Sequence, residues 1–185
     1  MALTPTKNIP LGFLAPYFNL FNPLINKKVD LNEIKGSKAT VIIFMCNHCP
    51  YVIHILDQLV KIANDYTEKQ IAFIGINSNN IISHPQDSPE NMVKLINEYN
   101  IPFHYLFDET QEVAKAYDAA CTPDFSVFDK NMKCVYRGQI DSSRPGNKLP
   151  NNGRDLRDVL ENILNKKSIS KEQIPSIGCN IKWKN

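Results

Sequence analysis

The chain has 185 residues, of which 43% are hydrophobic and 22% charged, and its formal net charge is +2. These proportions are typical of a globular protein with a substantial core, so we expect one domain over residues 1–185. A charge this close to balance gives no reason to expect nucleic acid or an anionic membrane surface as a partner.

No segment approaches the roughly 18 apolar residues that a membrane helix needs. The N-terminal stretch is interrupted by Pro5, Pro10 and Pro16 and has no apolar run typical of a signal peptide. We therefore expect no membrane association and a cytoplasmic location. The cysteines do not form a disulfide framework, because there are five of them and they are unevenly spaced. They are Cys46, Cys49, Cys121, Cys134 and Cys179.

The first half of the chain alternates strand and helix patterns. Residues 39–45 are continuously apolar and β-branched, which predicts a strand covered on both faces. An apolar stripe with helical spacing predicts a helix from about Cys49 to Glu68. A second strand is expected over 71–77, and a helix follows from Pro89 to about Asn100, with Ser88 as its N-cap.

The second half predicts a short strand near 103–108, a short helix, and a β-hairpin that begins at Asp124. A loop rich in Pro, Gly and Asn separates this hairpin from a final amphipathic helix that starts at Arg154. The early strands are joined through helices, which implies parallel crossovers, whereas the closing pair is antiparallel. The fold class is therefore α/β, with helices on both faces of a mixed sheet.

Two cysteines and a histidine lie between the first predicted strand and helix, in the sequence Cys46-Asn47-His48-Cys49-Pro50. Unpaired N–H groups at a helix start favour a thiolate, so we expect the pKa of Cys46 to fall from about 8.5 into the range of about 3.5–7.5. Cys49 is expected one turn away on the same face, at a separation that suits a disulfide. Pro50 is compatible with the first turn of a helix.

His48 is expected to stabilise the Cys46 thiolate when protonated and thereby to tune the redox potential of the pair. A Cys-x-x-Cys that follows an apolar strand and opens a helix favours a redox-active dithiol. Two alternatives stay open at this point. One is a zinc site, although no second pair of ligands is suitably spaced, and the other is a pair of inert buried cysteines.

Four stretches of the chain resemble one known group of proteins: FMCNHCPYV, LFDETQEVAKAYDAACTPDFSVFD, VYRGQIDSSRP and PSIGCNIKWK. Together they are similar to the thioredoxin-like superfamily, in particular to its peroxiredoxin-like branch related to alkyl hydroperoxide reductase and thiol-specific antioxidant proteins. The stretch PLGFLAPYFNL also resembles the start of redoxins, with Tyr17 where an acidic residue is usual. The resemblance implies a thioredoxin fold with an N-terminal extension and an extended C-terminal tail, residues 170–185, packed on the domain.

The resemblance also implies roles for particular residues. Cys46 would be the attacking cysteine and Cys49 the resolving one. Thr122 and Pro123 would be joined by a cis peptide bond that faces the dithiol, and this loop would bind an extended substrate segment by strand addition. The alternative for Thr122-Pro123 is an ordinary turn before a strand.

Three positions depart from the patterns of the related groups. Ile43 stands where peroxiredoxins have a threonine, and the proline of the same loop is missing, which argues against a standard peroxidase. Met45 stands where thioredoxins have a tryptophan, so ordinary thioredoxin substrates are not expected. Arg137 is expected to be an exposed strand residue, with thiolate stabilisation as the alternative.

The remaining thiols and the loop after the second strand offer further candidates. Cys121 and Cys179 are possible additional redox thiols, because Cys121 lies two residues before Pro123 and Cys179 lies in the tail. A small buried hydrophobe is the simpler interpretation of Cys121. Cys134 is expected to be structural. His84 and Asp87 follow a strand end, where α/β folds place sites.

The sequence therefore predicts a thiol–disulfide oxidoreductase that uses Cys46 and Cys49 in cell redox homeostasis, with no cofactor and no metal. Its expected partners are protein or small-molecule disulfides and thiols, together with a thiol electron donor. One alternative is an antioxidant thiol peroxidase, in which Cys46 is oxidised to a sulfenic acid and resolved by Cys49. A less favoured alternative is a metal-binding carrier module that uses Cys46, Cys49 and His48.

Overall fold

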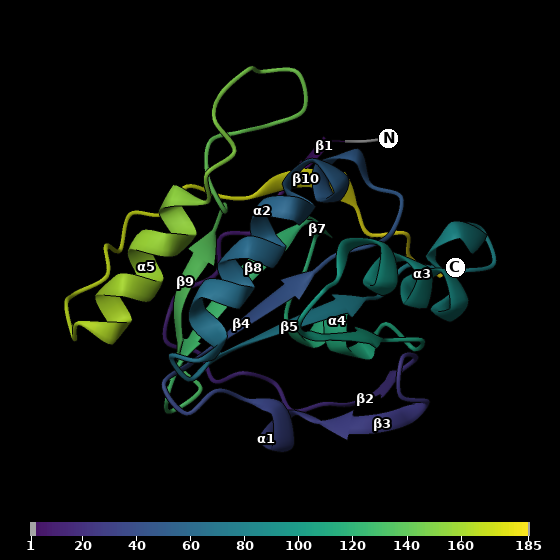
Figure 1. Ribbon diagram of the computed structural model, residues 1–185, viewed down its shortest axis with the longest axis horizontal. Coiled ribbons are helices and arrows are strands. Elements are labelled where there is room, and N and C mark those ends of the chain that lie inside the picture. Colours follow the sequence, from purple (N-terminus) through teal and green to yellow (C-terminus); the bar gives the residue numbers. More distant parts are fainter. Residues whose placement is uncertain (1–2, 185) are drawn as a thin grey trace.

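The computed structural model describes residues 3–184 and is built around a seven-stranded mixed sheet with strand order β3-β2-β6-β5-β4-β8-β9 (Figure 1). The strands of this sheet are β2 (Asn19–Asn22), β3 (Lys27–Asp30), β4 (Ala39–Phe44), β5 (Ile71–Asn77), β6 (His104–Phe107), β8 (Asp124–Asp129) and β9 (Cys134–Gly138). The helices are α1 (Leu31–Ile34), α2 (Pro50–Thr67), α3 (Pro89–Tyr99), α4 (Glu112–Ala116) and α5 (Arg154–Leu164), with a 3₁₀ turn, η1 (Pro85–Asp87).

Strand β4 is an interior strand of this sheet, parallel to β5 on one side and antiparallel to β8 on the other. Its side chains alternate between two cores, as the period of a strand requires. Val41 and Ile43 face one core, while Ile42 and Phe44 face the other, and all four are buried. The sequence prediction of a strand covered on both faces is therefore confirmed.

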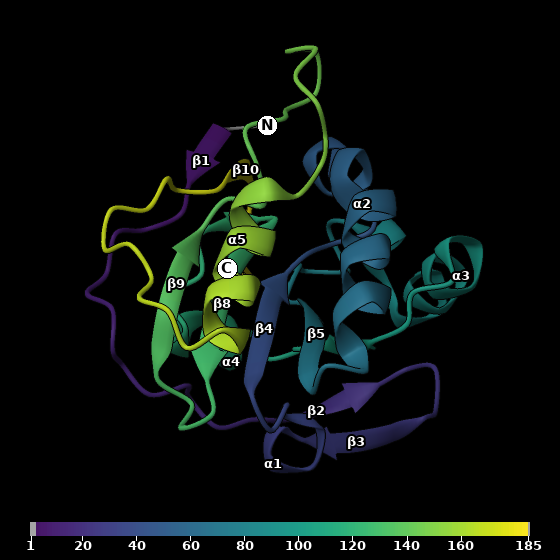
Figure 2. The same ribbon diagram turned by 60° about the vertical axis from the view of Figure 1, so that its left-hand side comes forward.

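Helices cover both faces of the sheet, as predicted (Figure 1, Figure 2). Buried residues of α2, α3 and α5 share one core with Val41, and Leu31 of α1 and Ala114 of α4 belong to the other. Helix α3 begins at Pro89, and Ser88 is its N-cap, as predicted. The Ser88 side chain accepts a hydrogen bond from the Asn91 N–H. Within residues 3–184, no helix combines the length and apolar character required to span a membrane.

The connection from β4 to α2 differs from the sequence prediction. The strand ends at Phe44, one residue early, and the helix begins at Pro50 with Cys49 as its N-cap. Proline suits the first helical position because its fixed φ matches the helix and its missing N–H would have no partner there. Cys46 therefore lies in the connecting turn, not in the first turn of the helix, and the two cysteines are not joined by a helical turn.

A second, three-stranded sheet was not predicted and joins distant parts of the chain. Its order is β1 (Leu3–Pro5), β10 (Ile177–Asn180) and β7 (Cys121–Thr122), all antiparallel. Figure 1 shows β10 at the N-terminal end of α2, which it contacts, and β1 pairs with β10. The register sets Cys179 opposite Thr122, so the tail is placed directly against the segment that precedes Pro123.

Arg137 on β9 is buried, which corrects the expectation of an exposed strand arginine. Its guanidinium donates to the carbonyl oxygens of Tyr117 and Asp118, both at 2.8 Å, and to that of Lys7. It also lies 3.6 Å from the buried carboxylate of Asp124. Arg137 therefore joins β9 to β8 and to the segment after α4, and its hydrogen bonds go to the backbone, not to a thiol.

Replacing Arg137 by methionine should destabilise the fold by about 3 kcal/mol, because the Asp124 carboxylate and three carbonyl groups lose their donor in the interior. Urea unfolding should show a lower midpoint with an unchanged slope. Lys133→Met, on an exposed side chain near the same hairpin, is the matched control. Equal midpoints for the two variants would contradict the structural role of Arg137.

Candidate functional site

The structure brings together the four residues that the sequence placed at the centre of the site. Cys46 follows β4, Cys49 caps α2, Thr122 ends β7, and Pro123 connects β7 to β8. The Thr122-Pro123 peptide bond is cis, as the resemblance implied. Cys46 Sγ lies 3.4 Å from Thr122 Oγ1, and Cys49 Sγ in its thiol form donates to the Thr122 carbonyl oxygen at 3.1 Å. Both sulfurs therefore converge on the residue that precedes the cis proline.

A third sulfur completes the cluster. Cys179 Sγ on β10 lies 2.9 Å from Cys49 Sγ. All three side chains are shielded from solvent, with exposed fractions of 1% for Cys46, 0% for Cys49 and 4% for Cys179. Cys121 contacts the Pro123 carbonyl oxygen at 3.6 Å, and Cys134 contacts the Tyr136 carbonyl oxygen at 3.4 Å.

The hydrogen bonds of the cluster favour the thiolate of Cys49 over that of Cys46, whose pKa the sequence indicated would be lowered. When Cys49 is ionised, the Cys46 thiol, the Cys179 thiol and the Thr122 hydroxyl donate hydrogen bonds to it, and they lower its pKa to about 5 against the cost of burial. The hydrogen bond that Cys46 donates to Cys49 raises the pKa of Cys46, and burial raises it further. Burial and the neighbouring Cys49 raise the pKa of Cys179 to about 12. The three thiols thus hold a single anion between them near neutral pH.

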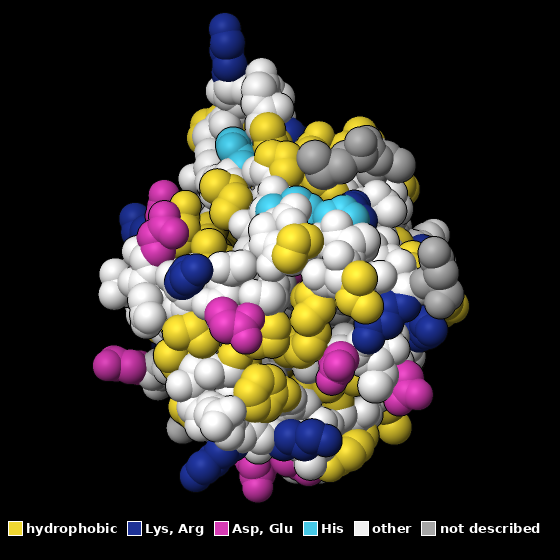
Figure 3. Space-filling model, turned by 90° about the vertical axis from the view of Figure 1, so that its right-hand side faces the viewer, with side chains coloured by type: hydrophobic (Ala, Val, Ile, Leu, Met, Phe, Trp, Pro, Cys, Tyr) yellow, Lys and Arg dark blue, Asp and Glu magenta, His cyan; other side chains and the backbone are white. Residues whose placement is uncertain are grey.

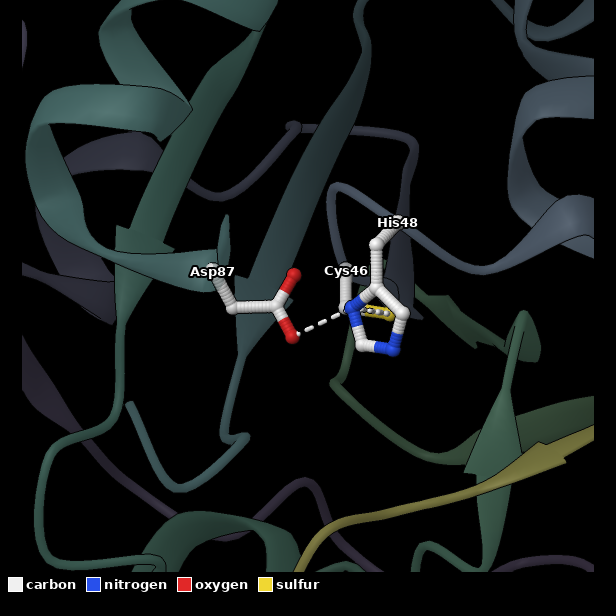
Figure 4. Close-up of side chains that lie close together, drawn as sticks. All are labelled: Cys46, His48 and Asp87. Carbon is white, nitrogen blue, oxygen red and sulfur yellow. Dashed lines mark hydrogen bonds and ion pairs between the residues drawn. The ribbon is translucent and has the colours of Figure 1, made fainter. Parts of the chain in front are cut away.

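His48 is held beside Cys46 by a buried carboxylate (Figure 4). Its Nδ1 lies 2.8 Å from Oδ2 of Asp87 and 4.0 Å from Cys46 Sγ. Figure 4 shows Asp87 and Cys46 on either side of the ring nitrogen. The ring of His84 stacks on that of His48 with centroids 5.3 Å apart. Histidine side chains also appear at the surface of this side of the molecule in Figure 3.

Asp87 is a part of the site that the sequence analysis indicated only weakly. It comes from η1, in the loop after β5, and is fully buried. Its Oδ1 accepts from the Asn47 N–H and its Oδ2 accepts from Asn79 Nδ2, both at 2.8 Å. The feature of the sequence that pointed to Asp87 was its loop, which follows the carboxyl end of a parallel strand, where α/β folds place sites. The negative charge of Asp87 adds to the forces that raise the pKa of Cys46.

Three of these side chains also form a possible metal-ligand group. One ligand atom each from Cys46, His48 and Asp87 lies within 4.8 Å of the others. This set differs from the Cys46, Cys49 and His48 set suggested by the sequence, because Cys49 is turned toward Cys179. Within this group, His48 Nδ1 and Asp87 Oδ2 pair directly with each other at 2.8 Å.

A small hollow adjoins the cis proline. Its lining comes from α2, the Pro123 segment, the loop after β9 and the tail. Among its lining residues are Tyr51, His54, Pro123, Ser143, Arg144 and Ile177. Aromatic, apolar and cationic side chains thus lie beside the proposed substrate-binding loop.

The fold and the dithiol junction define a thioredoxin-like protein. The chain matches the redoxin family over residues 10–156, and it therefore belongs to the redoxin family. No curated protein sequence matches the chain at a significant level.

Two similar solved structures cover nearly the whole chain. One is an uncharacterized conserved protein from Geobacillus kaustophilus, with 52% identity and a TM-score of 0.97, covering 100% of this chain and 97% of that one. The other is a hypothetical protein from Sinorhizobium meliloti 1021, with 41% identity, a TM-score of 0.95 and 98% coverage of both chains.

A more distant structure has a functional name. The thioredoxin domain of a thiol–disulfide oxidoreductase from Bacteroides vulgatus is 19% identical, with a TM-score of 0.63, and the match covers 82% of this chain and 99% of that domain. At this identity the likeness concerns the fold, and it confirms the thioredoxin-like architecture expected from the sequence.

The reduced protein should carry a thiolate on Cys49 at neutral pH. The pKa of Cys49 is lowered from 9.0 to about 5, so the ultraviolet absorbance of the thiolate should appear as pH rises through about 5 and be lost in Cys49→Ser. Because the folded protein then holds fewer protons than the unfolded chain, this group stabilises the fold increasingly toward pH 9, and the contribution is lost as pH falls through about 5. A first thiol titration near 9 would contradict this assignment.

Asp87→Asn should lower the pKa of Cys46, because it removes a buried negative charge that opposes ionisation of that thiol. The pH profile of Cys46 alkylation, followed by mass spectrometry in a Cys49→Ser background, should shift to lower pH. Glu90→Gln is the matched control, since it removes an acidic charge from the exposed first turn of α3. An unshifted profile in Asp87→Asn would show that Asp87 does not act on Cys46.

Proposed function

We propose that the protein is a thiol–disulfide oxidoreductase in which Cys46 and Cys49 alternate between dithiol and disulfide. The observation that carries this proposal is the convergence of both sulfurs on Thr122, beside the cis Pro123. The hydrogen bond from Cys46 to Cys49 adds to it, because it brings the two thiols within reach of each other and shares one anion between them. Membership of the redoxin family supports the same chemistry.

Cys46 is the better placed nucleophile, although the resting charge lies on Cys49. Cys49 is enclosed by Thr122 and Cys179, whereas Cys46 adjoins the half-buried His48. Movement of the Cys46 proton along its hydrogen bond to Cys49 leaves Cys46 as the thiolate. The charge thus transfers within the pair, and no outside base is needed for the first step.

The reaction then follows thiol–disulfide exchange. The Cys46 thiolate attacks one sulfur of a substrate disulfide, forms a mixed disulfide and releases a substrate thiolate, which takes the proton from Cys49. The Cys49 thiolate attacks Cys46 Sγ, the mixed disulfide breaks, and the second substrate sulfur leaves as a thiolate that takes its proton from water. The substrate gains the two electrons that the Cys46–Cys49 pair loses. A thiol donor restores the dithiol, and the reverse sequence oxidises a substrate dithiol.

The substrates we propose are disulfides presented on an extended segment or a small molecule. Thr122 and Pro123 form the binding loop, and the neighbouring hollow with Tyr51 and Arg144 offers apolar and cationic contacts. The aromatic ring suits an apolar side chain next to the substrate cysteine, and the guanidinium suits a carboxylate.

Cys46→Ser should abolish reduction of glutathione disulfide, whereas Cys49→Ser should stop after the first exchange and accumulate a mixed disulfide on Cys46. Product release and intact-mass spectrometry measure the two effects. Cys134→Ser is the control, because that buried thiol lies on β9 and donates to the carbonyl oxygen of Tyr136 on the same strand. Full turnover by Cys46→Ser would overturn the proposed function.

The same variants test the alternative of a thiol peroxidase, in which peroxide oxidises Cys46 to a sulfenic acid that Cys49 resolves. Rapid loss of free thiol with micromolar-range peroxide, together with slow exchange with disulfides, would favour that alternative. Stoichiometric zinc in protein purified without chelators would favour the carrier module, now with Asp87 as a third ligand beside Cys46 and His48.

A further inference from the structure

We propose that Cys179 is a third redox thiol, which forms a disulfide with Cys49 and thereby returns Cys46 to its reduced form. This inference rests on the proposed function and extends it from a two-thiol pair to a three-thiol relay. The relay would run within the cluster of Cys46, Cys49 and Cys179, in which Cys49 contacts both of the other cysteines.

The first support is the geometry of the sulfurs. Cys49 Sγ and Cys179 Sγ are 2.9 Å apart, which is closer than the usual hydrogen-bond separation of a thiol and leaves little movement before a bond can form. The backbone N–H of Cys179 also donates to Cys49, so the two residues are aligned by main chain as well as side chain. By contrast, Cys121 and Cys134 direct their thiols to backbone carbonyl groups.

The second support is the construction of the strand that carries Cys179. Gly178 faces the cis-proline loop, and a Cβ atom at this position would lie 2.0 Å from the Thr122 carbonyl oxygen and 2.6 Å from the Thr122 carbonyl carbon. A glycine is therefore required for β10 to approach β7 this closely. The close approach is what brings the Cys179 sulfur to Cys49.

The third support is the way the tail is fixed on both sides of Cys179. Before it, the Ser176 hydroxyl donates to the Gly138 carbonyl oxygen at 2.9 Å. After it, the Ile181 N–H donates to the Ala120 carbonyl oxygen, and the Lys182 N–H donates to Asn79 Oδ1 at 2.8 Å. The Cys179 sulfur is consequently held in place within the cluster, and ordering it costs no further entropy during the reaction.

The relay step is an internal exchange that balances without an outside reagent. After substrate reduction, Cys46 and Cys49 form a disulfide. The Cys179 sulfur attacks Cys49 Sγ, the Cys46–Cys49 bond breaks, and the Cys179 proton passes to the departing Cys46 sulfur. Oxidation of Cys49 also removes the negative charge that helps to raise the pKa of Cys179, so the attacking thiol ionises more readily in this state.

The test uses the reduced full-length protein, treated with one equivalent of glutathione disulfide, quenched in acid, alkylated and digested with trypsin. Lys61 and Lys171 are cleavage sites that place Cys179 on a different peptide from Cys46 and Cys49. The expected result in the wild type is a cross-linked pair of these peptides with Cys46 alkylated. The same cross-link should form in Cys134→Ser and be lost in Cys179→Ser, and it should also be lost in Cys46→Ser, which cannot form the Cys46–Cys49 disulfide that the relay passes on.

Gly178→Ala retains all three thiols and tests the geometry separately. The added methyl group must push β10 away from Thr122, so the cross-link should be lost while the Cys46–Cys49 disulfide still forms. An unchanged cross-link in Gly178→Ala would show that the close approach of β10 to Thr122 is not needed for the Cys49–Cys179 disulfide. That result would overturn the geometric argument.

The outcomes distinguish this inference from the function on which it rests. A wild-type protein that forms the Cys46–Cys49 disulfide but no cross-link to Cys179 overturns the relay and leaves the oxidoreductase function intact. A cross-link that forms in Cys46→Ser as readily as in the wild type overturns it as well, because the disulfide then reaches Cys179 without passing through the Cys46–Cys49 pair. Absence of both disulfides overturns the proposed function together with the relay.

Discussion

The burial of β4 on both faces is the constraint on which the site depends. Two cores hold the strand, and its register with β8 pairs Phe44 with Asp124, the residue directly after Pro123. The connection that leaves β4 must therefore begin beside the cis-proline loop. Since α2 starts at Pro50, only a short turn is available, and it delivers Cys46 and Cys49 to Thr122.

Charge in the interior is arranged around the same turn. Asp87 accepts hydrogen bonds from the Asn47 backbone, Asn79 and His48, so its buried carboxylate is fully bonded. The cluster of thiols supplies a second buried anion, which resides on Cys49 because its neighbours donate to it. Asp87 opposes ionisation of Cys46 and is not among the groups that act on Cys49, so a thiolate on Cys49 meets less repulsion from the Asp87 carboxylate.

The sequence predicted the elements whose signal is local. Strands β4 and β5, helices α2, α3 and α5, and the hairpin that starts at Asp124 follow from apolar periodicity and caps. Strands β1, β2, β3 and β10 were missed because they are short, and their pairing depends on distant partners, as when Leu3 pairs with Cys179.

The site shows the same division between local and long-range information. The Cys-x-x-Cys junction and the Thr122-Pro123 peptide bond were predicted from motifs and resemblance. The contacts of Asp87 with His48 and of Cys179 with Cys49 needed the packed structure, since nothing local marks either pair. The expected fall in the pKa of Cys46 was wrong for a similar reason, because this pKa depends on where the helix begins and on the hydrogen bond between Cys46 and Cys49.

The attachment of the tail has a consequence for how long an internal disulfide would last. Backbone bonds from Ile181 and Lys182 hold the tail on one side of Cys179, and the Ser176 hydroxyl holds it on the other. A bond between Cys49 and Cys179 would lie beneath this cover, where a bulky reductant has no direct approach. Its lifetime would be governed by attack from the neighbouring Cys46 sulfur, and so by events within the chain, with little dependence on the concentration of thiols outside it.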